Sequence, residues 1–326
     1  MSLTSRLYYY SRIFSAYVTP VHSHLSFWHE KPELNAHARI DDIGEYYMTF
    51  AEKADYTAEM DDTGMPFLNY RGRIGRQYNP IAIAQWGLGN YNQFCRTKAA
   101  HRELNFLKAS DWLCTHLEQN PKGAWVWNHY FDWEYRTRLR APWYSALAQG
   151  QGISLLIRAY RQTGEAKYLG AAARAFGPFL KPVCEGGVTF TDREGNLWFE
   201  EYIVTPPTHI LNGFIWACWG VFDYFLLTRS SIAGDLFEAA IKTLHNNLER
   251  YDLGYWSLYE QSGTWLRMVA SPFYHRLHIV QLQAMYRMTG DDTFHRYAEK
   301  WQSYIRSGTN RVRALCSKGV FKLCYY

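Results

Sequence analysis

Tyrosines from separate parts of the chain, Tyr202, Tyr255, Tyr259 and Tyr274, are expected on one rim and are suited to acid–base chemistry. A phenol has an ordinary pKa of about 10, so it donates a proton readily at neutral pH but needs a cationic neighbour to act as a base. Arg267 offers such a charge, and a guanidinium also holds a carboxylate at two points. Together with the carboxylate of Glu201, this set indicates chemistry on an acidic sugar.

Two amides, Asn212 and Gln149, are expected at the loop-facing starts of helices, where an amide can bind a hydroxyl or a carboxylate. Each also has a structural alternative. An amide at a helix end can satisfy backbone groups, Glu201 can cap a loop, and any of the 26 tyrosines can be a packed ring with its hydroxyl bonded. The sequence leaves these alternatives open.

Metal and cofactor motifs are absent from the sequence. His275 and His278 are spaced i, i+3 without a third ligand, and the six cysteines contain no CxxC pair, which suits a reducing compartment. The stretch Gly87-Leu88-Gly89 lacks the third glycine of a dinucleotide-binding loop. We therefore expect neither a metal nor a cofactor.

A repeat must position these residues. Tyr78, Trp143, His209 and Tyr274 are separated by 65, 66 and 65 residues, and each leads into an apolar helix rich in small residues. These apolar helices are expected over Ala82–Tyr91, Leu147–Tyr160, Leu211–Tyr224 and Leu277–Tyr286. A more polar, amphipathic helix follows each one: Ala99–Leu117, Ala166–Leu180, Leu236–Leu248 and Thr293–Ile305.

A helix that is apolar on all sides must be enclosed, and an amphipathic helix can cover it. Four such pairs predict an all-α-dominant fold, an α/α toroid that is whole or incomplete, with an inner and an outer ring. Small residues such as Gly87, Gly89, Gly150 and Gly152 would let inner helices approach closely. A stacked helical solenoid is the alternative, but its repeats are shorter, roughly 34 to 47 residues.

The segments between the pairs are aromatic and turn-rich, and they predict β-hairpins on one rim of the toroid, where a site is expected. These segments are Lys122–Arg140, Cys184–Pro207 and Tyr251–Pro272. The sequence thus divides into three expected regions: an N-terminal extension over 1–70 that packs on the toroid, the toroid over 71–308, and a basic tail over 309–326.

Composition narrows the function classes. The 326 residues are 48% apolar and 20% charged, as in a globular protein with a substantial core, and the net charge of +5 reflects the basic tail. We expect no nucleic-acid partner and no membrane insertion, although Ile210–Leu227 approaches the length of a membrane span. Residues Leu3–Val18 lack the continuous apolar stretch of a secretory signal, so a cytoplasmic location is expected. A homodimer is one possible assembly.

Several short motifs, in one order, resemble the D-glucuronyl C5-epimerase family, which acts on heparosan-type polysaccharides. They are Tyr78-Asn79-Pro80-Ile81-Ala82-Ile83-Ala84-Gln85, Ala148-Gln149-Gly150-Gln151, Glu200-Glu201-Tyr202, Leu211-Asn212-Gly213-Phe214, Tyr251-Asp252 with Tyr259, and Tyr274-His275 with His278-Ile279.

The resemblance implies an α/α toroid and inversion of D-glucuronate to L-iduronate, with Tyr202, Tyr259 and Tyr274 as catalytic residues and Glu201 and Asn212 near the substrate. An acidic polysaccharide would be the substrate. The chain departs from the family in having Ser262 where an arginine follows the second tyrosine, and Arg267 is the expected replacement. A uronate lyase or hydrolase and a non-catalytic glycan-binding protein remain alternatives.

Overall fold

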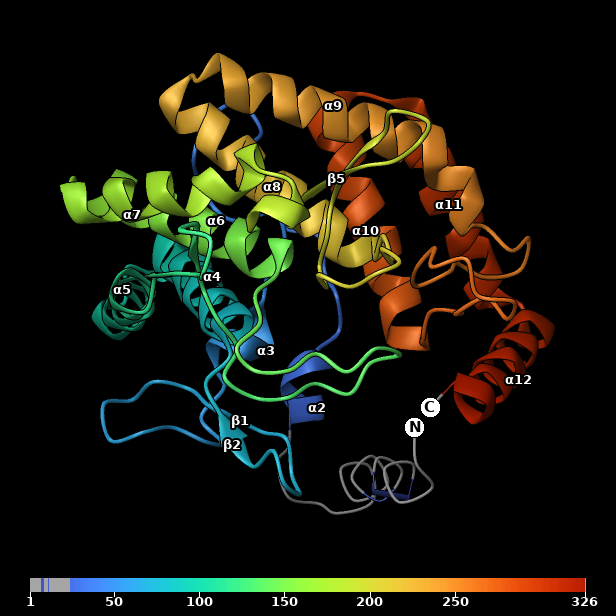
Figure 1. Ribbon diagram of the computed structural model, residues 1–326. Coiled ribbons are helices and arrows are strands. Elements are labelled where there is room, and N and C mark those ends of the chain that lie inside the picture. Colours follow the sequence, from blue (N-terminus) through green and yellow to red (C-terminus); the bar gives the residue numbers. More distant parts are fainter. Residues whose placement is uncertain (1–6, 9–10, 12–23, 326) are drawn as a thin grey trace.

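The computed structural model describes residues 7–8, 11 and 24–325, and helices dominate it (Figure 1). In this part of the chain, eight long helices form four consecutive pairs. The pairs are α4 (Pro80–Thr97) with α5 (Ala100–Thr115), α6 (Ala146–Thr163) with α7 (Ala166–Phe176), α8 (Leu211–Thr228) with α9 (Ser231–Asn247), and α10 (Pro272–Thr289) with α11 (Asp292–Arg306). The predicted α/α toroid is confirmed, in an incomplete form.

The first helix of each pair is an inner helix, and each of the four is 18 residues long. Side chains cap three of them; the Asn79 carboxamide, for example, accepts hydrogen bonds from the amides of Ile81 and Ala82, and Pro80 fits the first turn. Every inner helix ends at a residue in the left-handed conformation, which stops the helix before its outer partner begins. These residues are Lys98, Gly164, Arg229 and Gly290.

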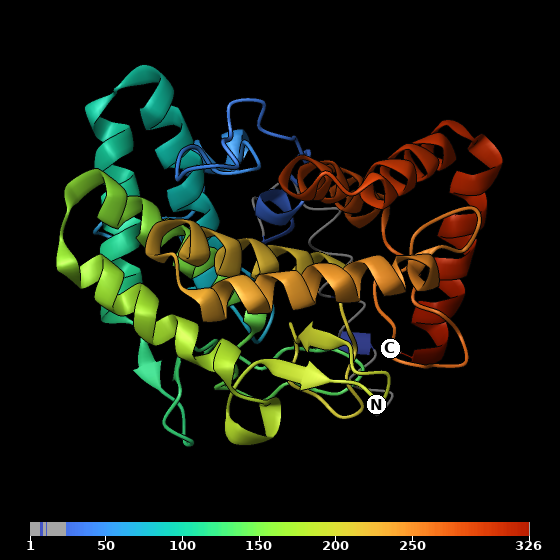
Figure 2. The same cartoon turned by 90° about the horizontal axis from the view of Figure 1, so that it is seen from above.

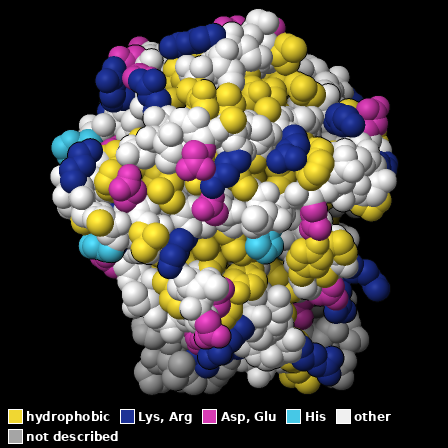
Figure 3. All heavy atoms as spheres, turned by 90° about the vertical axis from the view of Figure 1, so that its left-hand side faces the viewer, with side chains coloured by type: hydrophobic (Ala, Val, Ile, Leu, Met, Phe, Trp, Pro, Cys, Tyr) yellow, Lys and Arg dark blue, Asp and Glu magenta, His cyan; other side chains and the backbone are white. Residues whose placement is uncertain are grey.

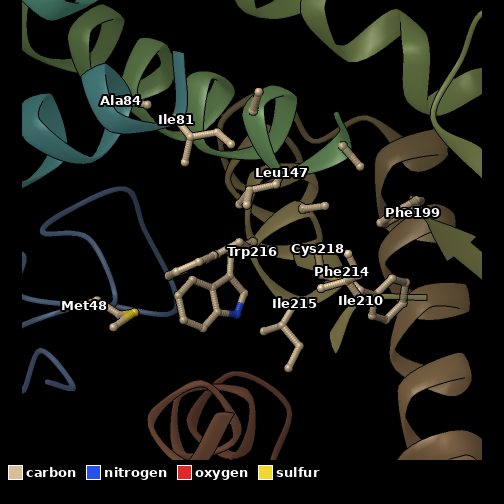
Figure 4. Close-up of a cluster of buried hydrophobic side chains, with 14 of the residues drawn as sticks. Met48, Ile81, Ala84, Leu147, Phe199, Ile210, Phe214, Ile215, Trp216 and Cys218 are labelled. Carbon is tan, nitrogen blue, oxygen red and sulfur yellow. The ribbon is translucent and has the colours of Figure 1, made fainter. Parts of the chain in front are cut away.

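The core lies among the inner helices. Helix α8 is apolar around its circumference and almost entirely buried, as expected for a helix enclosed by others. Figure 4 shows Trp216, Phe214 and Ile215 of α8 in a cluster with Leu147 of α6 and Met48 of the N-terminal region. The outer helices cover this core with one face each.

Helix α4 packs on α6, α6 on α8, and α8 on α10, so the inner helices form an arc. The N-terminal region lies on the side between α4 and α10 (Figure 2). Arg287 of α10 donates a hydrogen bond to the Asn35 carbonyl, at 2.8 Å, and the Tyr47 hydroxyl donates to Asp223 of α8, at 2.7 Å. Asp223 also pairs with buried Arg158 of α6, at 2.6 Å. A buried polar network thus fixes the N-terminal region to the arc.

Glycines allow one very close contact between inner helices. A Cβ on Gly150 of α6 would lie 2.6 Å from the Ala217 Cα of α8, and a Cβ on Gly220 would lie 2.2 Å from the Gly150 carbonyl oxygen. Gly152 has a different role from the one predicted, because it makes room for the Trp127 ring of a loop. Close helix approach is therefore confirmed for α6 and α8.

Short strands form three two-stranded antiparallel sheets, one before the first helix pair and two in the loops between pairs. They are β1 (Leu68–Asn69) with β2 (Arg76–Gln77), β3 (Glu118–Gln119) with β4 (Trp125–Val126), and β5 (Thr189–Thr191) with β6 (Leu197–Phe199). The segment Tyr251–Pro272, which was predicted as a β-hairpin, contains the isolated bridges Asp252–Ser257 and Leu258–Val269 in place of continuous strands. Two of its backbone groups bond to helices instead: the Ser257 amide donates to the His275 ring of α10, and the Val269 carbonyl accepts from Lys318 near the C-terminus.

Shorter elements complete the fold. They are α2 (His24–Trp28), α3 (Ala51–Ala54) and the 3₁₀ turns η1 (Gly177–Leu180), η2 (Val183–Glu185) and η3 (Leu248–Tyr251). The basic segment predicted as a tail forms helix α12 (Gly308–Tyr325). Of the predicted extension over 1–70, residues 1–6, 9–10 and 12–23 lie outside the described residues.

The outer surface is mixed in charge. On the face shown in Figure 3, lysines and arginines are interspersed with aspartates and glutamates. Among the described residues, no helix is long and apolar enough to cross a membrane.

Candidate active site

A cavity of about 450 Å³ lies at the amino-terminal ends of the inner helices. All four of these helices contribute to its wall, through residues such as Gln85, Leu147, Asn212 and Tyr274. The amino-terminal ends direct their positive dipole poles toward the cavity, which favours an anionic ligand. The repeat therefore gathers equivalent helix ends around one space.

The three predicted tyrosines all line this cavity. Tyr259 and Tyr274 form one aromatic pair, with ring centroids 4.8 Å apart and planes inclined at 64°. Tyr202 belongs to a second cluster, where it lies 4.8 Å from the Tyr135 ring and 5.7 Å from the Trp143 ring. Two separate groups of phenols thus face the same space.

Glu201 and Asn212 also line the cavity. The Asn212 amide lies 3.5 Å from a Glu201 carboxylate oxygen, and that oxygen is so close to α8 that a Cβ on Gly213 would lie 2.1 Å from it. Burial raises the pKa of Glu201 to about 8, because the charged form loses its solvation. Glu201 therefore holds a proton at neutral pH and can donate a hydrogen bond.

The neighbouring carboxylate, Glu200, faces away from the cavity. It accepts hydrogen bonds from the backbone amides of Thr208 and His209, and its other oxygen lies 2.5 Å from the His209 ring. His209 has a positive φ of 47°. Glu200 thus fixes the turn that leads into α8, and the two adjacent glutamates have different tasks.

Five buried polar atoms of residues that line the cavity have no hydrogen-bond partner among the described residues. They are the Glu30 Oε2, Gln85 Oε1, Tyr135 hydroxyl, Asn212 Oδ1 and Trp216 Nε1 atoms. A buried polar group without a partner is costly, and ligand hydroxyls are suitable partners for such groups. Sequence reasoning missed Gln85 and Trp216 as binding residues, although Gln85 ends the first motif of the family resemblance.

Two predicted binding residues do not border the cavity. Gln149 is fully buried, and its amide bonds to the backbone of Trp125, Trp127 and Ala175, which is the structural alternative for an amide at a helix start. Arg267 is exposed and lies outside the lining. The predicted arginine clamp is therefore not formed by Arg267.

The cations that line the cavity among the described residues are lysines. They are Lys31, Lys53, Lys318 and Lys322. Lys53 lies 3.5 Å from Glu30, and Lys31 lies 2.8 Å from Glu33. The sequence places Lys318 and Lys322 in a basic tail that could guide a polyanion or be a solvated end, and it does not predict any of the four lysines at the cavity.

The two histidines that were considered as metal ligands are structural. Both His275 and His278 lie at hydrogen-bond distance from the Ser257 hydroxyl, and the His275 ring stacks on Trp256 with centroids 3.9 Å apart. Burial lowers the pKa of His275 to about 4 and that of His278 below its ordinary value. Within the described residues, no three His, Cys, Asp or Glu side chains form a metal-binding group.

The α/α toroid is also the fold of a solved carbohydrate epimerase. Cellobiose 2-epimerase from Spirochaeta thermophila DSM 6192 superimposes with a TM-score of 0.54 over 93% of this chain and 86% of that chain, at 11% identity. This likeness concerns the fold.

Residues 119–303 match the family described as D-glucuronyl C5-epimerase C-terminus, and the chain belongs to that family. It is 33% identical over 215 residues to a D-glucuronyl C5-epimerase of Caenorhabditis elegans, across 61% of this chain and 34% of that protein. It is 32% identical over 180 residues to the uncharacterized protein MJ1128 of Methanocaldococcus jannaschii, across 54% of this chain and 57% of that protein. The chain thus matches about a third of the nematode protein and just over half of the archaeal one. Helices α4, α5 and α12 lie outside the family match.

Proposed function

We propose that the chain is a carbohydrate epimerase that inverts C5 of D-glucuronate residues in a heparosan-like acidic polysaccharide. The observation that carries the proposal is the meeting of Tyr202, Tyr259 and Tyr274 at one cavity, although they are distant in the sequence. Membership of the C5-epimerase family supports the reaction type.

The reaction needs a base on one face of the sugar and an acid on the other. C5 carries a hydrogen next to the carboxylate, so its removal leaves an electron pair that spreads into the carboxylate oxygens. A proton added to C5 from the opposite face gives L-iduronate, and no bond to carbon other than C–H changes. Tyr202 in one aromatic cluster and the Tyr259–Tyr274 pair in another supply phenols from two parts of the wall.

The intermediate needs hydrogen-bond donors where its negative charge develops. Protonated Glu201 is one such donor, since a neutral carboxylic acid can donate to an oxyanion without bringing a like charge. The Asn212 carboxamide, next to Glu201, is a second group within the cavity wall. The orphan polar atoms of Gln85 and Trp216 suit sugar hydroxyls.

Deuterium uptake from heavy water tests the proposal. The protein is incubated with heparosan and related glucuronans, and deuterium at C5 is followed by NMR and mass spectrometry. We expect exchange without chain cleavage, because the base and acid return solvent-derived protons to C5. An ultraviolet-absorbing unsaturated product would indicate a lyase instead, and binding without exchange would indicate a glycan-binding protein.

The variants Tyr202→Phe, Tyr259→Phe and Tyr274→Phe assign the roles. At least two of them should lose exchange by roughly 100-fold or more, the usual contribution of general acid–base catalysis, while they still bind the polysaccharide. Tyr297→Phe is the matched control, because Tyr297 lies on outer helix α11 and outside the cavity lining. Normal exchange in all three cavity variants would refute the assignment.

A further inference from the structure

Helix α12 closes one side of the cavity. Phe321 is fully buried, and the hydroxyls of Ser317 and Tyr255 lie 3.1 Å apart, which fixes the helix against the loop before α10. Figure 1 shows α12 beside this loop. Ser317, Lys318 and Phe321 share one helix face by their spacing, so the same contacts that dock α12 also orient Lys318.

Lys318 brings its ammonium group next to a proposed catalytic tyrosine. The Nζ atom lies 5.6 Å from the centroid of the Tyr259 ring and donates a hydrogen bond to the Val269 carbonyl, at 2.7 Å. An ammonium group has three donors, so this bond leaves two of them for a ligand. Lys318 is therefore placed to contact both Tyr259 and a substrate.

Lys318 differs from two other lysines of the cavity in its partners. Lys53 and Lys31 each have a carboxylate partner, at 3.5 and 2.8 Å. Among the described residues Lys318 forms no salt bridge, and Glu260 affects it only through longer-range attraction. Burial lowers the pKa of Lys318 to about 7, with a contribution from the nearby charge of Lys322. A half-buried amine of this kind is stabilised in its charged form by an anion.

The position where the family carries an arginine does not supply a cation here. Ser262 donates a hydrogen bond to Glu260, at 2.5 Å, and Arg267 is exposed and away from the lining. A site for a uronate needs a positive charge near the carboxylate that activates C5. Lys318 comes from a helix that follows the family match, which ends at residue 303.

We propose that Lys318 binds the carboxylate of the glucuronate residue and replaces the missing arginine. This inference rests on the proposed function, because it assigns the group that recognises the acidic sugar. The ammonium donates to the carboxylate oxygens, while its bond to Val269 holds it beside Tyr259. The carboxylate then lies where C5 can face that tyrosine.

The test compares a heparosan oligosaccharide with its carboxyl-reduced form, in which each glucuronate is converted to neutral glucose. Affinities are measured by calorimetry at fixed ionic strength for the parent, Lys318→Met, Lys318→Gln and Lys318→Arg. Methionine removes both the charge and the N–H donors, whereas glutamine removes the charge and keeps an N–H donor on a side chain that is one bond shorter. Arg311→Gln is the matched control, because Arg311 is an exposed cation of α12 outside the lining.

We expect Lys318→Met and Lys318→Gln to weaken binding of the acidic oligosaccharide by about tenfold or more, as the loss of a charge-assisted hydrogen bond predicts. For both variants, the affinity for the carboxyl-reduced form should stay within about twofold of the parent. The control Arg311→Gln should bind the acidic oligosaccharide within about twofold of the parent, because charges at the rim of a site add little affinity. Lys318→Arg should keep most of the preference for the acidic form. Thermal unfolding of each variant verifies the fold.

Equal weakening of both ligands, no weakening, or a parent without preference for the acidic ligand would overturn the role of Lys318. The exchange assay separates this failure from failure of the proposed function. If the parent prefers the acidic ligand through Lys318 but does not exchange C5, the epimerase proposal is wrong and the carboxylate site stands. If the parent exchanges C5 and Lys318→Gln keeps the preference, the carboxylate site is wrong and the epimerase proposal stands.

Discussion

Replacement of Glu201 by glutamine tests whether the cavity holds a protonated carboxyl group. Glu201 is buried beside Asn212 and against Gly213, and burial raises its pKa from 4.5 to about 8. The charge of Glu200 adds to the increase, while a hydrogen bond with Tyr202 opposes it. Glutamine has nearly the same shape and no charge at any pH, so Glu201→Gln removes the titration and keeps the packing.

The sign follows from proton binding. Between pH 4.5 and about 8 the unfolded chain releases the Glu201 proton and the folded protein keeps it, so the stability of the parent falls as pH rises. The loss of unfolding free energy due to Glu201 grows by about 1.4 kcal/mol for each pH unit and approaches roughly 5 kcal/mol near pH 8. Above that pH the folded protein also loses the proton, and the cost becomes constant. Glu201→Gln should escape this cost entirely.

Denaturant unfolding of the parent and of Glu201→Gln from pH 5 to 9 measures the effect. The difference in unfolding free energy between the two proteins should increase with pH up to about 8 and then level off, since other titrating groups cancel in the difference. Glu238→Gln, on the exposed face of α9, is the matched control. A difference that does not change with pH would mean that Glu201 is already ionised in the folded protein, and its proposed role as a donor would fail.

Two further substitutions test the scaffold. Gly220→Ala should lower stability by at least about 2 kcal/mol in denaturant unfolding, because the added Cβ would lie 2.2 Å from the Gly150 carbonyl oxygen and backbone cannot move aside easily. Its control, Gly170→Ala on outer helix α7, meets no atom within 4 Å and should stabilise by up to about 1 kcal/mol; equal effects would contradict the close packing. Asp223→Asn should cost about 3 to 5 kcal/mol by leaving Arg158 buried without its charged partner, and a loss below about 1 kcal/mol would show that this pair does not hold the arc.

The helix pairs could be predicted because each leaves a local signature. An inner helix such as α8 is apolar on every side, and its partner is amphipathic, so the order of the two follows from the sequence. The interval of 65 or 66 residues then places every long loop in the same slot of the repeat. The repeat alone therefore predicts that Tyr202, Tyr259 and Tyr274 lie at one rim.

The direction of individual side chains could not be predicted in the same way. Gln149 and Asn212 both lie in the first turn of an inner helix, yet only Asn212 faces the cavity. Successive helix residues differ by about 100° in direction, so an error of one position in the helix start reverses such a prediction. Gln85 lies in the second turn of α4 and still borders the cavity, which spacing from the loop does not indicate.

The position of Lys318 at the cavity could not be predicted for another reason, because α12 has no counterpart in the repeat. Its basic residues indicate a solvated segment when they are read without a partner. The docking of α12 depends on single contacts, such as buried Phe321 and the bond from Lys318 to Val269, and these become visible only when the loop before α10 is in place.

The cavity perturbs an acid and a base in opposite directions, and this argues for a uronate rather than a neutral sugar. Burial raises the pKa of Glu201 to about 8 and lowers that of Lys318 to about 7, so both groups are biased toward their uncharged forms. A neutral sugar offers nothing that stabilises the charged form of the half-buried Lys318. A carboxylate stabilises the ammonium and accepts a hydrogen bond from protonated Glu201 without repulsion. These two groups therefore support the proposed acidic substrate.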